Sequence, residues 1–385
     1  MSPPGTQGRL FELPDLPPSG PEPSSAPYQL TNQPPGVNPR FGANREPPST
    51  RYQGSKRKLL KWIGDSLRDF PARTVLDLFG GTASVSYSFK REGKAVTYND
   101  YLRFNHWIGT ALIENSRTRL SSSDMEFVCR RDPGSSYDDF IARTFQGIYF
   151  TDEENHWLDT ACQNIPRLPD PYRQALAYYA LFQAALRKRP YNLFHRRNLY
   201  MRTAKVRRGF GNKATWDSPF EDQFREFADI ANRAVIDCKV ECRAICQDAL
   251  DVSPGYDLVY IDPPYVSGAG VGVDYLAFYH FLEGMIDYPH WEARLDTRRK
   301  HLPLLGSRSP WSDPKQIRAQ FERLFALHAE SILCVSYRSD GIPSEAELLE
   351  MLREVKTHVK CLRHATYQYA LSTNQKSDEL LLIGW

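Results

Sequence analysis

Short apolar runs alternate with longer amphipathic segments along most of the chain, and this pattern predicts an α/β fold. Runs typical of buried strands occupy residues 74–79, 95–98, 240–249, 258–261, 332–337 and 379–383, and residues 359–369 alternate as a further strand. Apolar residues at helical spacing predict helices near residues 59–63, 84–90, 102–118, 172–186, 221–235, 274–286, 314–328 and 344–355. Because helices separate most of these strands, we expect an open α/β sheet.

The four residues Asp262-Pro263-Pro264-Tyr265 directly follow the buried run at 258–261. Open α/β sheets bind ligands at the carboxyl ends of their strands. Two prolines fix φ twice and remove two N–H donors, so the carbonyls beside them have few local partners and can accept hydrogen bonds. Together with the Asp262 carboxylate and the flat Tyr265 ring, they suit a planar base that carries an amino group. For these four residues alone, a Pro-Pro turn with a structural tyrosine is an equal alternative.

A glycine turn follows the first predicted strand, with Gly80 and Gly81 before a helix. This geometry lets a ligand approach the backbone closely. The second strand ends in Asn99-Asp100, and a carboxylate about 20 residues past a glycine turn is placed to accept from ribose hydroxyls. Ala83 replaces the last glycine of the usual pattern, and no phosphate-binding Lys-Ser or Lys-Thr follows. A nucleoside without a pyrophosphate therefore fits best, and S-adenosylmethionine is such a nucleoside.

Two further positions could contact that ligand. A Gly-Ser turn precedes Lys56, and this lysine with the backbone N–H groups of the helix start would bind a carboxylate; a solvated basic helix start is the alternative. Asp248 ends the run at 240–249. It could accept from an adenine amino group or cap the next turn, and the sequence leaves both open.

Residues 119–235 interrupt the strand–helix alternation, since they contain several helices and few strand signals. Within them, ten Lys or Arg and no Asp or Glu lie between Arg187 and Lys213, with aromatic residues interleaved. A basic surface face normally carries acidic partners, so this stretch favours contacts to nucleic-acid phosphates over a merely solvated face. The predicted DNA-binding residues are Arg187, Lys188, Arg189, Tyr191, Asn192, Arg196, Arg197, Arg207, Arg208 and Lys213.

The composition limits the class of protein. The net charge is +3, with 41% hydrophobic and 25% charged residues, as in soluble enzymes, and no apolar run approaches the ~20 residues that span a bilayer. Residues 1–50 hold almost half of the 28 prolines and few large apolar side chains, which predicts a disordered tail and no secretory signal. The odd count of seven cysteines indicates reduced thiols in a cytoplasm. Cys238, Cys242 and Cys246 have even spacing but lack a nearby fourth ligand, so we expect no metal.

These residue types permit one reaction in particular. The adenine amino group is a poor nucleophile because its lone pair is delocalised into the ring. Asp262 and the Pro263 carbonyl could accept its two N–H groups and favour the charge that develops during methyl transfer. Tyr265 would stack on the base and hold it in line with the methyl group. The base would have to flip out of a duplex to reach this strand end.

The order of the motifs is distinctive: a basic Gly-Ser-Lys motif, a glycine turn, a basic insert and then Asp-Pro-Pro-Tyr. It resembles the Dam-like alpha group of DNA adenine-N6 methyltransferases, in the branch of the FokI-type modification enzymes, from about Arg51 to Trp385. The resemblance implies a Rossmann-like fold for an S-adenosylmethionine-dependent methyltransferase, with an inserted, mainly helical target recognition domain. The implied organisation is a disordered tail at 1–50, the first part of the catalytic domain at 51–118, the DNA-binding insert at 119–235 and the second part of the catalytic domain at 236–385.

The resemblance also assigns residues. It implies that Tyr52, Lys56, Phe79, Gly81 and Asp100 surround S-adenosylmethionine, with Asp262 at the reacting centre. Gln53, Asp77, Gly80, Asn99 and Asp248 complete the predicted cofactor-binding set, and Asp262, Pro263, Pro264 and Tyr265 are the predicted catalytic residues. Residues 268–330 receive no role.

The function expected from these patterns is site-specific methylation of adenine N6 in double-stranded DNA. We expect a monomeric enzyme of a prokaryote or a phage, located in the cytoplasm and associated with the nucleoid. A restriction–modification role with a cognate endonuclease is implied by the family, whereas the recognition sequence is not. Two alternatives stay open at this point. One is an RNA adenine-N6 methyltransferase with the same pocket, and the other is a catalytically inactive methyltransferase-like module that only binds DNA.

Overall fold

A computed structural model describes residues 46–204, 213–365 and 377–385. Nearly all of the predicted Pro-rich tail, and the predicted DNA contacts Arg207 and Arg208, lie outside these residues. The described chain forms a seven-stranded sheet whose strands are β1 (Thr74–Asp77), β2 (Ala95–Asn99), β3 (Arg243–Ile245), β4 (Leu258–Ile261), β5 (Ile332–Arg338), β6 (Val359–His364) and β7 (Glu379–Gly384). All seven predicted strands are therefore present.

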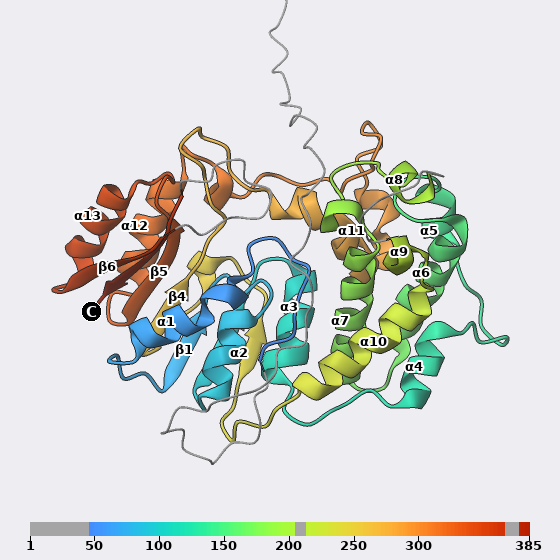
Figure 1. The fold of residues 1–385 in the computed structure, drawn as a ribbon, viewed down its shortest axis with the longest axis horizontal. Coiled ribbons are helices and arrows are strands. Elements are labelled where there is room, and N and C mark those ends of the chain that lie inside the picture. Colours follow the sequence, from blue (N-terminus) through green and yellow to red (C-terminus); the bar gives the residue numbers. More distant parts are fainter. Residues whose placement is uncertain (1–45, 205–212, 366–376) are drawn as a thin grey trace, which may run out of the picture. The chain divides into compact units, whose positions relative to one another are not determined.

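The strands lie side by side in the order β3-β2-β1-β4-β5-β7-β6 (Figure 1). Strands β3 to β5 pair in parallel, whereas β7 runs antiparallel between β5 and β6. The carboxyl ends of β1, β2 and β4 consequently meet at one edge of the sheet, as the ligand-site prediction required. Strand β3 is much shorter than the predicted run at 240–249. As the edge strand it pairs only with the end of β2, and the chain leaves the sheet before Asp248.

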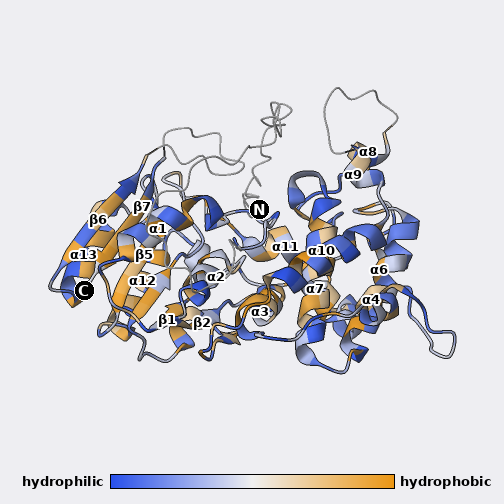
Figure 2. Cartoon of the chain, turned by 60° about the horizontal axis from the view of Figure 1, so that its bottom comes forward, coloured by the Kyte–Doolittle hydropathy of each residue, from blue (hydrophilic) through white to orange (hydrophobic). Residues whose placement is uncertain are grey.

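Apolar side chains of the strands alternate between two cores on opposite faces of the sheet. Along β4, Leu258 and Tyr260 join the core shared with helices α1 and α2, whereas Val259 and Ile261 join the core shared with α12 and α13. Figure 2 shows the sheet strands as largely apolar. This two-residue period explains why continuous apolar runs mark these strands, because both faces are covered by helices.

The helices occupy nearly the predicted positions. They are α1 (Leu60–Leu67), α2 (Ser84–Arg91), α3 (Arg103–Gly109), α4 (Ser122–Cys129), α5 (Phe140–Thr144), α6 (Asp152–Asn164), α7 (Pro171–Arg187), α8 (Tyr200–Thr203), α9 (Lys213–Asp217), α10 (Phe220–Ala234), α11 (Tyr275–Ile286), α12 (Ile317–Leu327) and α13 (Glu345–Val355). The predicted helix at 102–118 ends early, since α3 continues as a short π-helix that stops at Glu114. No helix in the described part is long and apolar enough to cross a membrane.

The described part of the chain between β2 and β3 consists of helices and their connecting loops and contains no strand, as expected for the insert. Helix α7 lies at its centre, with every residue from Ala175 to Leu186 buried, and α10 packs along it. Helix α11 follows β4 in sequence, yet its Phe281 stacks on Phe194 and contacts Phe145 in the insert. The predicted domain boundaries stay a prediction, but the insert and α11 share one core.

Candidate active site

Asp262 follows the last residue of β4 and belongs to a buried polar network. Lys56 Nζ donates to Asp262 Oδ1 at 2.8 Å and to the Tyr265 hydroxyl at 2.7 Å. The Tyr265 hydroxyl lies 2.9 Å from Asp262 Oδ1 and 2.7 Å from Glu379 Oε1. Lys56 begins the short 3-10 helix η1 (Lys56–Leu59), and Glu379 begins β7. The fold therefore brings three predicted site residues together and adds a second carboxylate.

Burial and neighbouring charges act on Asp262 in opposite directions. Burial raises the pKa of its carboxyl to about 6; the Lys56 ammonium opposes this rise and the Glu379 carboxylate adds to it. The Asp262 side chain is 15% exposed and that of Lys56 is 5% exposed, so water screens their attraction weakly. The capacity of Asp262 to accept a hydrogen bond near neutral pH consequently depends on these two neighbours.

Pro263 and Pro264 are buried at the end of the strand. No N–H or O–H group of the described residues donates to either carbonyl. This agrees with the prediction that two prolines leave acceptors without local partners. Tyr265 packs its ring edge-on to Tyr337, with centroids 5.1 Å apart, so the ring is held from one side by the protein.

The glycine turn after β1 packs tightly against β2. A Cβ at Gly80 would lie 2.1 Å from the ring of Tyr98, so only glycine fits there. Gly81 has a φ of +47°, and the nearest group to a Cβ placed on it would be the Tyr52 ring at 3.8 Å. A side chain at Gly81 would therefore be in van der Waals contact with Tyr52, and the positive φ favours glycine at this position.

Asp77, the last residue of β1, has one carboxylate oxygen that meets no donor within the described ranges. Its Oδ2 accepts from the Ser86 hydroxyl at 2.6 Å, while Oδ1 is buried and meets no donor among the described residues. Asp77 is 1% exposed, and burial raises its pKa to about 7. A buried acceptor of this kind is costly unless a ligand supplies a donor.

Asp100 closes the same turn from β2. Its carboxylate accepts from the amides of Gly81 and Leu102, at 3.0 and 2.9 Å, and from Asn105 Nδ2 at 3.0 Å. Burial raises the pKa of Asp100 to about 6, against these hydrogen bonds. Three bonds leave one lone-pair direction of the two oxygens for a ligand hydroxyl.

Asn99 has a structural task. Its Nδ2 donates to the carbonyls of Leu78 and Gln247, and its Oδ1 accepts from the Gln247 amide. Since the whole side-chain amide is used between strand ends, Asn99 supports the turn, and its predicted cofactor contact stays a prediction.

Tyr52 and Gln53 precede η1 and pack against α11. The Tyr52 ring stacks on Tyr279 and Tyr275, with centroids 4.5 and 5.5 Å away. The Gln53 amide donates to the Tyr279 hydroxyl at 2.8 Å, and Asn105 Nδ2 lies 3.3 Å from the Tyr52 hydroxyl. Helix α11, in the segment to which the sequence assigned no role, therefore supports the site.

Phe79 and Asp248 lie at the margin of this edge. The Phe79 ring packs against Trp311, with centroids 4.9 Å apart. Asp248 is exposed, and its Oδ1 accepts from the Leu250 amide at 3.0 Å as the cap of a short 3-10 turn. Of the two alternatives for Asp248, capping is therefore present in the structure, and a cofactor contact stays a proposal.

Comparison with known proteins identifies the class. A family model described as D12 class N6 adenine-specific DNA methyltransferase matches residues 52–312, more than half of the chain. The chain belongs to this D12 class. The predicted enzyme class, an adenine-specific DNA methyltransferase, is thereby confirmed.

Three relatives of this D12-class methyltransferase are modification enzymes. It is 29% identical over 360 residues to Type II methyltransferase M2.HphI of Haemophilus parahaemolyticus, covering 90% of this chain and 98% of the relative. It is 26% identical to modification methylase LlaI of Lactococcus lactis subsp. lactis and 24% identical to Type II methyltransferase M.FokI of Planomicrobium okeanokoites. Each of these two matches covers 79% of this chain but only about half of the relative, 48% and 46%.

The first basic residues of the stretch in the D12-class methyltransferase are buried or partly buried. Arg189 is 1% exposed, donates to three backbone carbonyls and packs over Tyr149, 4.5 Å from the ring centroid. Lys188 is also 1% exposed and pairs with Glu154 at 2.6 Å. Arg187 pairs with Glu226 and lies 4.0 Å from the Phe227 ring centroid. The burial of Lys188 and Arg189 corrects the prediction that they contact DNA, whereas Arg187, whose side chain is 16% exposed, stays a prediction. Acidic partners missing from the stretch come from α6 and α10.

Other described residues of the stretch lie on the surface. Tyr191 is 49% exposed, and both Tyr191 and Asn192 adopt left-handed backbone, with φ of 63° and 57°. Arg196 and Arg197 are exposed as well. Lys213 is exposed and pairs with Asp217 one turn along α9. These residues stay candidates for DNA contact.

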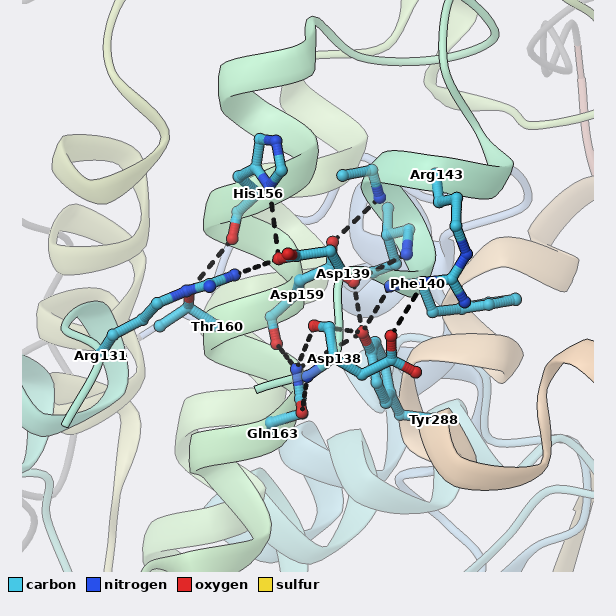
Figure 3. Close-up of polar contacts among 12 residues, drawn as sticks. Arg131, Asp138, Asp139, Phe140, Arg143, His156, Asp159, Thr160, Gln163 and Tyr288 are labelled. Carbon is cyan, nitrogen blue, oxygen red and sulfur yellow. Dashed lines mark hydrogen bonds and ion pairs between the residues drawn. The ribbon is translucent and has the colours of Figure 1, made fainter. Parts of the chain in front are cut away.

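Asp139, His156 and Asp159 form a cluster with ligand types that metals use (Figure 3). Asp139 accepts from Arg131 and faces His156 Nδ1 at 3.4 Å. Asp159 accepts from two backbone amides at the start of α5 and from the Tyr288 hydroxyl. Hydrogen bonds within the protein thus account for the arrangement, and we assign it to the packing of α5 on α6.

Several residues at the site escaped prediction: Tyr275, Tyr279, Trp311, Ser336 and Glu379. Glu379 had a signal, because a carboxylate at the start of the apolar run 379–383 must be buried and needs partners. Tyr275 and Tyr279 had a weaker one, since an i, i+4 aromatic pair marks one helix face. Trp311 had none.

Proposed function

We propose that the protein transfers a methyl group from S-adenosylmethionine to the N6 amino group of an adenine flipped out of duplex DNA at a specific sequence. The observation that carries this proposal is the Asp262 carboxylate at the end of β4, held by Lys56 and beside two proline carbonyls that meet no donor in the described part of the chain. In this proposal, Asp262 and the Pro263 carbonyl accept the two N–H groups of the amino group. The resulting hydrogen bonds strengthen as positive charge develops on the nitrogen.

Tyr265 serves to position the base in this scheme. Its hydroxyl is tied to Lys56 and Glu379, so the ring has a fixed place at the strand end. An aromatic face there would stack on a flipped base and align its amino nitrogen. Pro264 keeps the chain between Asp262 and Tyr265 in one conformation, because its ring fixes φ.

The residues around the glycine turn fit the cofactor. Asp77 Oδ1, which meets no donor among the described residues, supports binding of a ligand with a donor group. The absence of a side chain at Gly81 lets a ligand approach the backbone of the turn closely. We propose that Asp77, Gly81 and Asp100 hold S-adenosylmethionine, together with Tyr52, Gln53, Lys56, Phe79, Gly80 and Asp248. When bound, the cofactor supplies a methyl group on a positively charged sulfur.

The exposed part of the basic stretch is the proposed DNA contact. Two consecutive non-glycine residues in left-handed backbone are a strained arrangement that favours a functional role for Tyr191 and Asn192. The exposed Tyr191 ring and the exposed Arg196 and Arg197, five and six residues later in the same segment, offer a stacking surface and phosphate-binding charge. A DNA substrate follows from the family, whereas its double-stranded form and these individual contacts are part of the proposal.

The names of the relatives as type II and modification enzymes support a restriction–modification role with a cognate endonuclease. We include this role in the proposal. The monomeric state and the cytoplasmic location stay predictions from the sequence.

The test is transfer of a tritiated methyl group from S-adenosylmethionine into duplex DNA, followed by analysis of the nucleosides. We expect N6-methyladenine from the wild type, and a loss of at least about 100-fold in single-turnover rate for Asp262→Ala, with DNA affinity largely retained. Asp222→Ala removes the same group from an exposed position on α10 and is the matched control.

Other products would contradict the proposal. N4-methylcytosine would show that the site takes a different amino group. Preferential methylation of structured RNA in the same assay would favour the RNA alternative. A wild-type rate for Asp262→Ala would remove the proposed catalytic site.

A further inference from the structure

Glu379 is a carboxylate inside the sheet, completely buried at the start of β7. The alternation along β7 places it on the same face as Leu381 and Ile383, the face on which η1 lies. Burying a carboxylate is costly unless it is paired and hydrogen-bonded. Glu379 meets that requirement through groups of the candidate active site, so its position is tied to that site.

In the described part of the chain, the Glu379 carboxylate has contacts with three groups. The Tyr265 hydroxyl lies 2.7 Å from Oε1, the Ser336 hydroxyl donates to the same oxygen, and Lys56 Nζ lies 3.5 Å away. Two of these groups, Lys56 and Tyr265, also contact Asp262 Oδ1. Glu379 and Asp262 therefore share one ammonium and one phenol.

A phenol has a single proton, so Tyr265 can donate to only one of the two carboxylates at a time. If the Tyr265 hydroxyl donates its hydrogen bond to Glu379, Asp262 Oδ1 accepts from one donor fewer and can accept a hydrogen bond from the amino group of a base. If Glu379 were absent, the Tyr265 hydroxyl would donate to Asp262 and compete with the substrate. The hydroxyl would also lose the second anchor that fixes the ring.

We propose that Glu379 is a positioning residue for methyl transfer, which takes up the Tyr265 hydroxyl and shares Lys56 so that the ring stays in place and Asp262 stays free to accept the adenine amino group. This inference rests on the proposed catalytic role of Asp262. It extends the active site to the last strand of the sheet, which no sequence motif indicated.

The charge of Glu379 also acts on the ionisation of Asp262. The titratable groups that face Asp262 come from several elements and are Lys56 in η1, Asp77 in β1, Tyr260 in β4, Tyr265 after it, Tyr275 in α11, Cys334 in β5 and Glu379 in β7. Among them the Glu379 carboxylate raises the pKa of Asp262 and the Lys56 ammonium lowers it. Removing the Glu379 charge should therefore lower the pKa of Asp262.

The experiment compares Glu379→Gln with the wild type in single-turnover methylation at saturating DNA and S-adenosylmethionine. We expect the rate to fall about 10- to 100-fold, as for a misplaced reacting group, with both dissociation constants within about threefold of wild type. Because activity requires ionised Asp262, the acid limb of the pH–rate profile should move to lower pH. Glu350→Gln removes a carboxylate that is 64% exposed on α13 and should leave rate and profile unchanged.

A structural role would give a different result, namely a lower melting temperature with the acid limb in place, and that outcome would overturn the proposal.

Tyr265→Phe removes only the shared hydroxyl and creates no buried unpaired charge, so it tests the same contact if Glu379→Gln does not fold. We expect a similar loss of rate, and the double variant should be no more than about threefold slower than the slower single variant. A wild-type rate for Tyr265→Phe, or losses that multiply in the double variant, would exclude the shared-hydroxyl role.

Asp262→Ala separates this inference from the proposed function. If Asp262→Ala is inactive while Glu379→Gln behaves as wild type, only the positioning role fails. If Asp262→Ala retains the wild-type rate, the proposed catalytic site fails, and the role of Glu379 fails with it.

Discussion

Single carboxylates at the strand ends are held in environments that disfavour their charge. Asp77 is the clearest case, since it is almost completely buried and only one of its oxygens has a donor among the described residues. A buried carboxylate oxygen that lacks a donor lowers local stability, and such groups are common in binding sites, because a bound ligand can donate the missing hydrogen bond.

The pKa of Asp77 leads to a prediction about stability. Burial raises the pKa from 3.8 to about 7 in the folded state, so the folded protein prefers the protonated form. The stabilising contribution is complete below the unfolded pKa near 4 and is lost as the pH rises through about 7. Asp77→Asn cannot ionise, so we expect it to be more stable than the wild type at pH 8, by on the order of 2–4 kcal/mol, with the difference shrinking toward pH 5.

Urea unfolding of both proteins at pH 5, 6, 7 and 8 would measure this difference. Unfolding curves whose separation does not change with pH would show that Asp77 is not the titrating group. The cofactor should also bind Asp77→Asn more weakly if Oδ1 accepts from it.

The sequence allowed some residues of the site to be predicted but not others, and the difference has a physical reason. Asp262, Lys56 and Asp100 were found because each stands at a strand or helix end, where chain direction alone places them at the ligand edge. Lys188 and Arg189 were misassigned because local sequence shows charge but not burial, and their acceptors lie elsewhere in the chain. Glu379 was missed because its partners come from η1 and from beyond β4.

At the scale of elements, helix α11 connects the site to the insert. Tyr279 of this helix contacts residues 52–53. The Phe278 carbonyl of the same helix accepts from the Phe194 amide, and His280 Nε2 lies within hydrogen-bond distance of the Phe194 carbonyl. The helical spacing of its apolar residues made α11 predictable. The residues that α11 contacts were not predictable, because they lie far before it in the sequence and come close only in the folded sheet.

The contact between α11 and Gln53 can be tested by amide exchange. Tyr279→Phe removes the hydroxyl that accepts from the Gln53 amide, so we expect that amide to exchange faster, by about fivefold for the loss of a bond of about 1 kcal/mol. Tyr275→Phe is the matched control, since the hydroxyl of Tyr275 accepts no described backbone amide. Equal exchange in Tyr279→Phe and the wild type would show that this bond does not hold the entrance to η1.

At the scale of the whole molecule, the modest net charge of +3 conceals an uneven surface. Part of the basic stretch is neutralised internally by Glu154 and Glu226, so the number of positive charges counted in the sequence overstates those available to DNA. The general architecture was nonetheless predictable, because the order of strands, helices and insert follows from the periodicity of apolar residues.

The salt dependence of DNA binding measures the charges that remain available. We expect Arg196→Ala/Arg197→Ala to flatten the slope of log affinity against log salt by about 0.9 for each phosphate that the variant no longer neutralises. Lys188→Ala should lower stability and leave the slope unchanged, because Lys188 is buried.

Arg323→Ala/Arg353→Ala removes the same charge from exposed positions on α12 and α13 and is the control for this measurement. A slope equal to wild type for the Arg196/Arg197 variant would place the surface of the insert away from the phosphates.

The central place of β7 has a consequence for how the enzyme is made. This strand enters between β5 and β6, which are both synthesised before it, and it brings Glu379 to within 3.5 Å of Lys56, which is translated much earlier. A nascent polypeptide therefore cannot bring these two residues together until β7 has left the ribosomal tunnel.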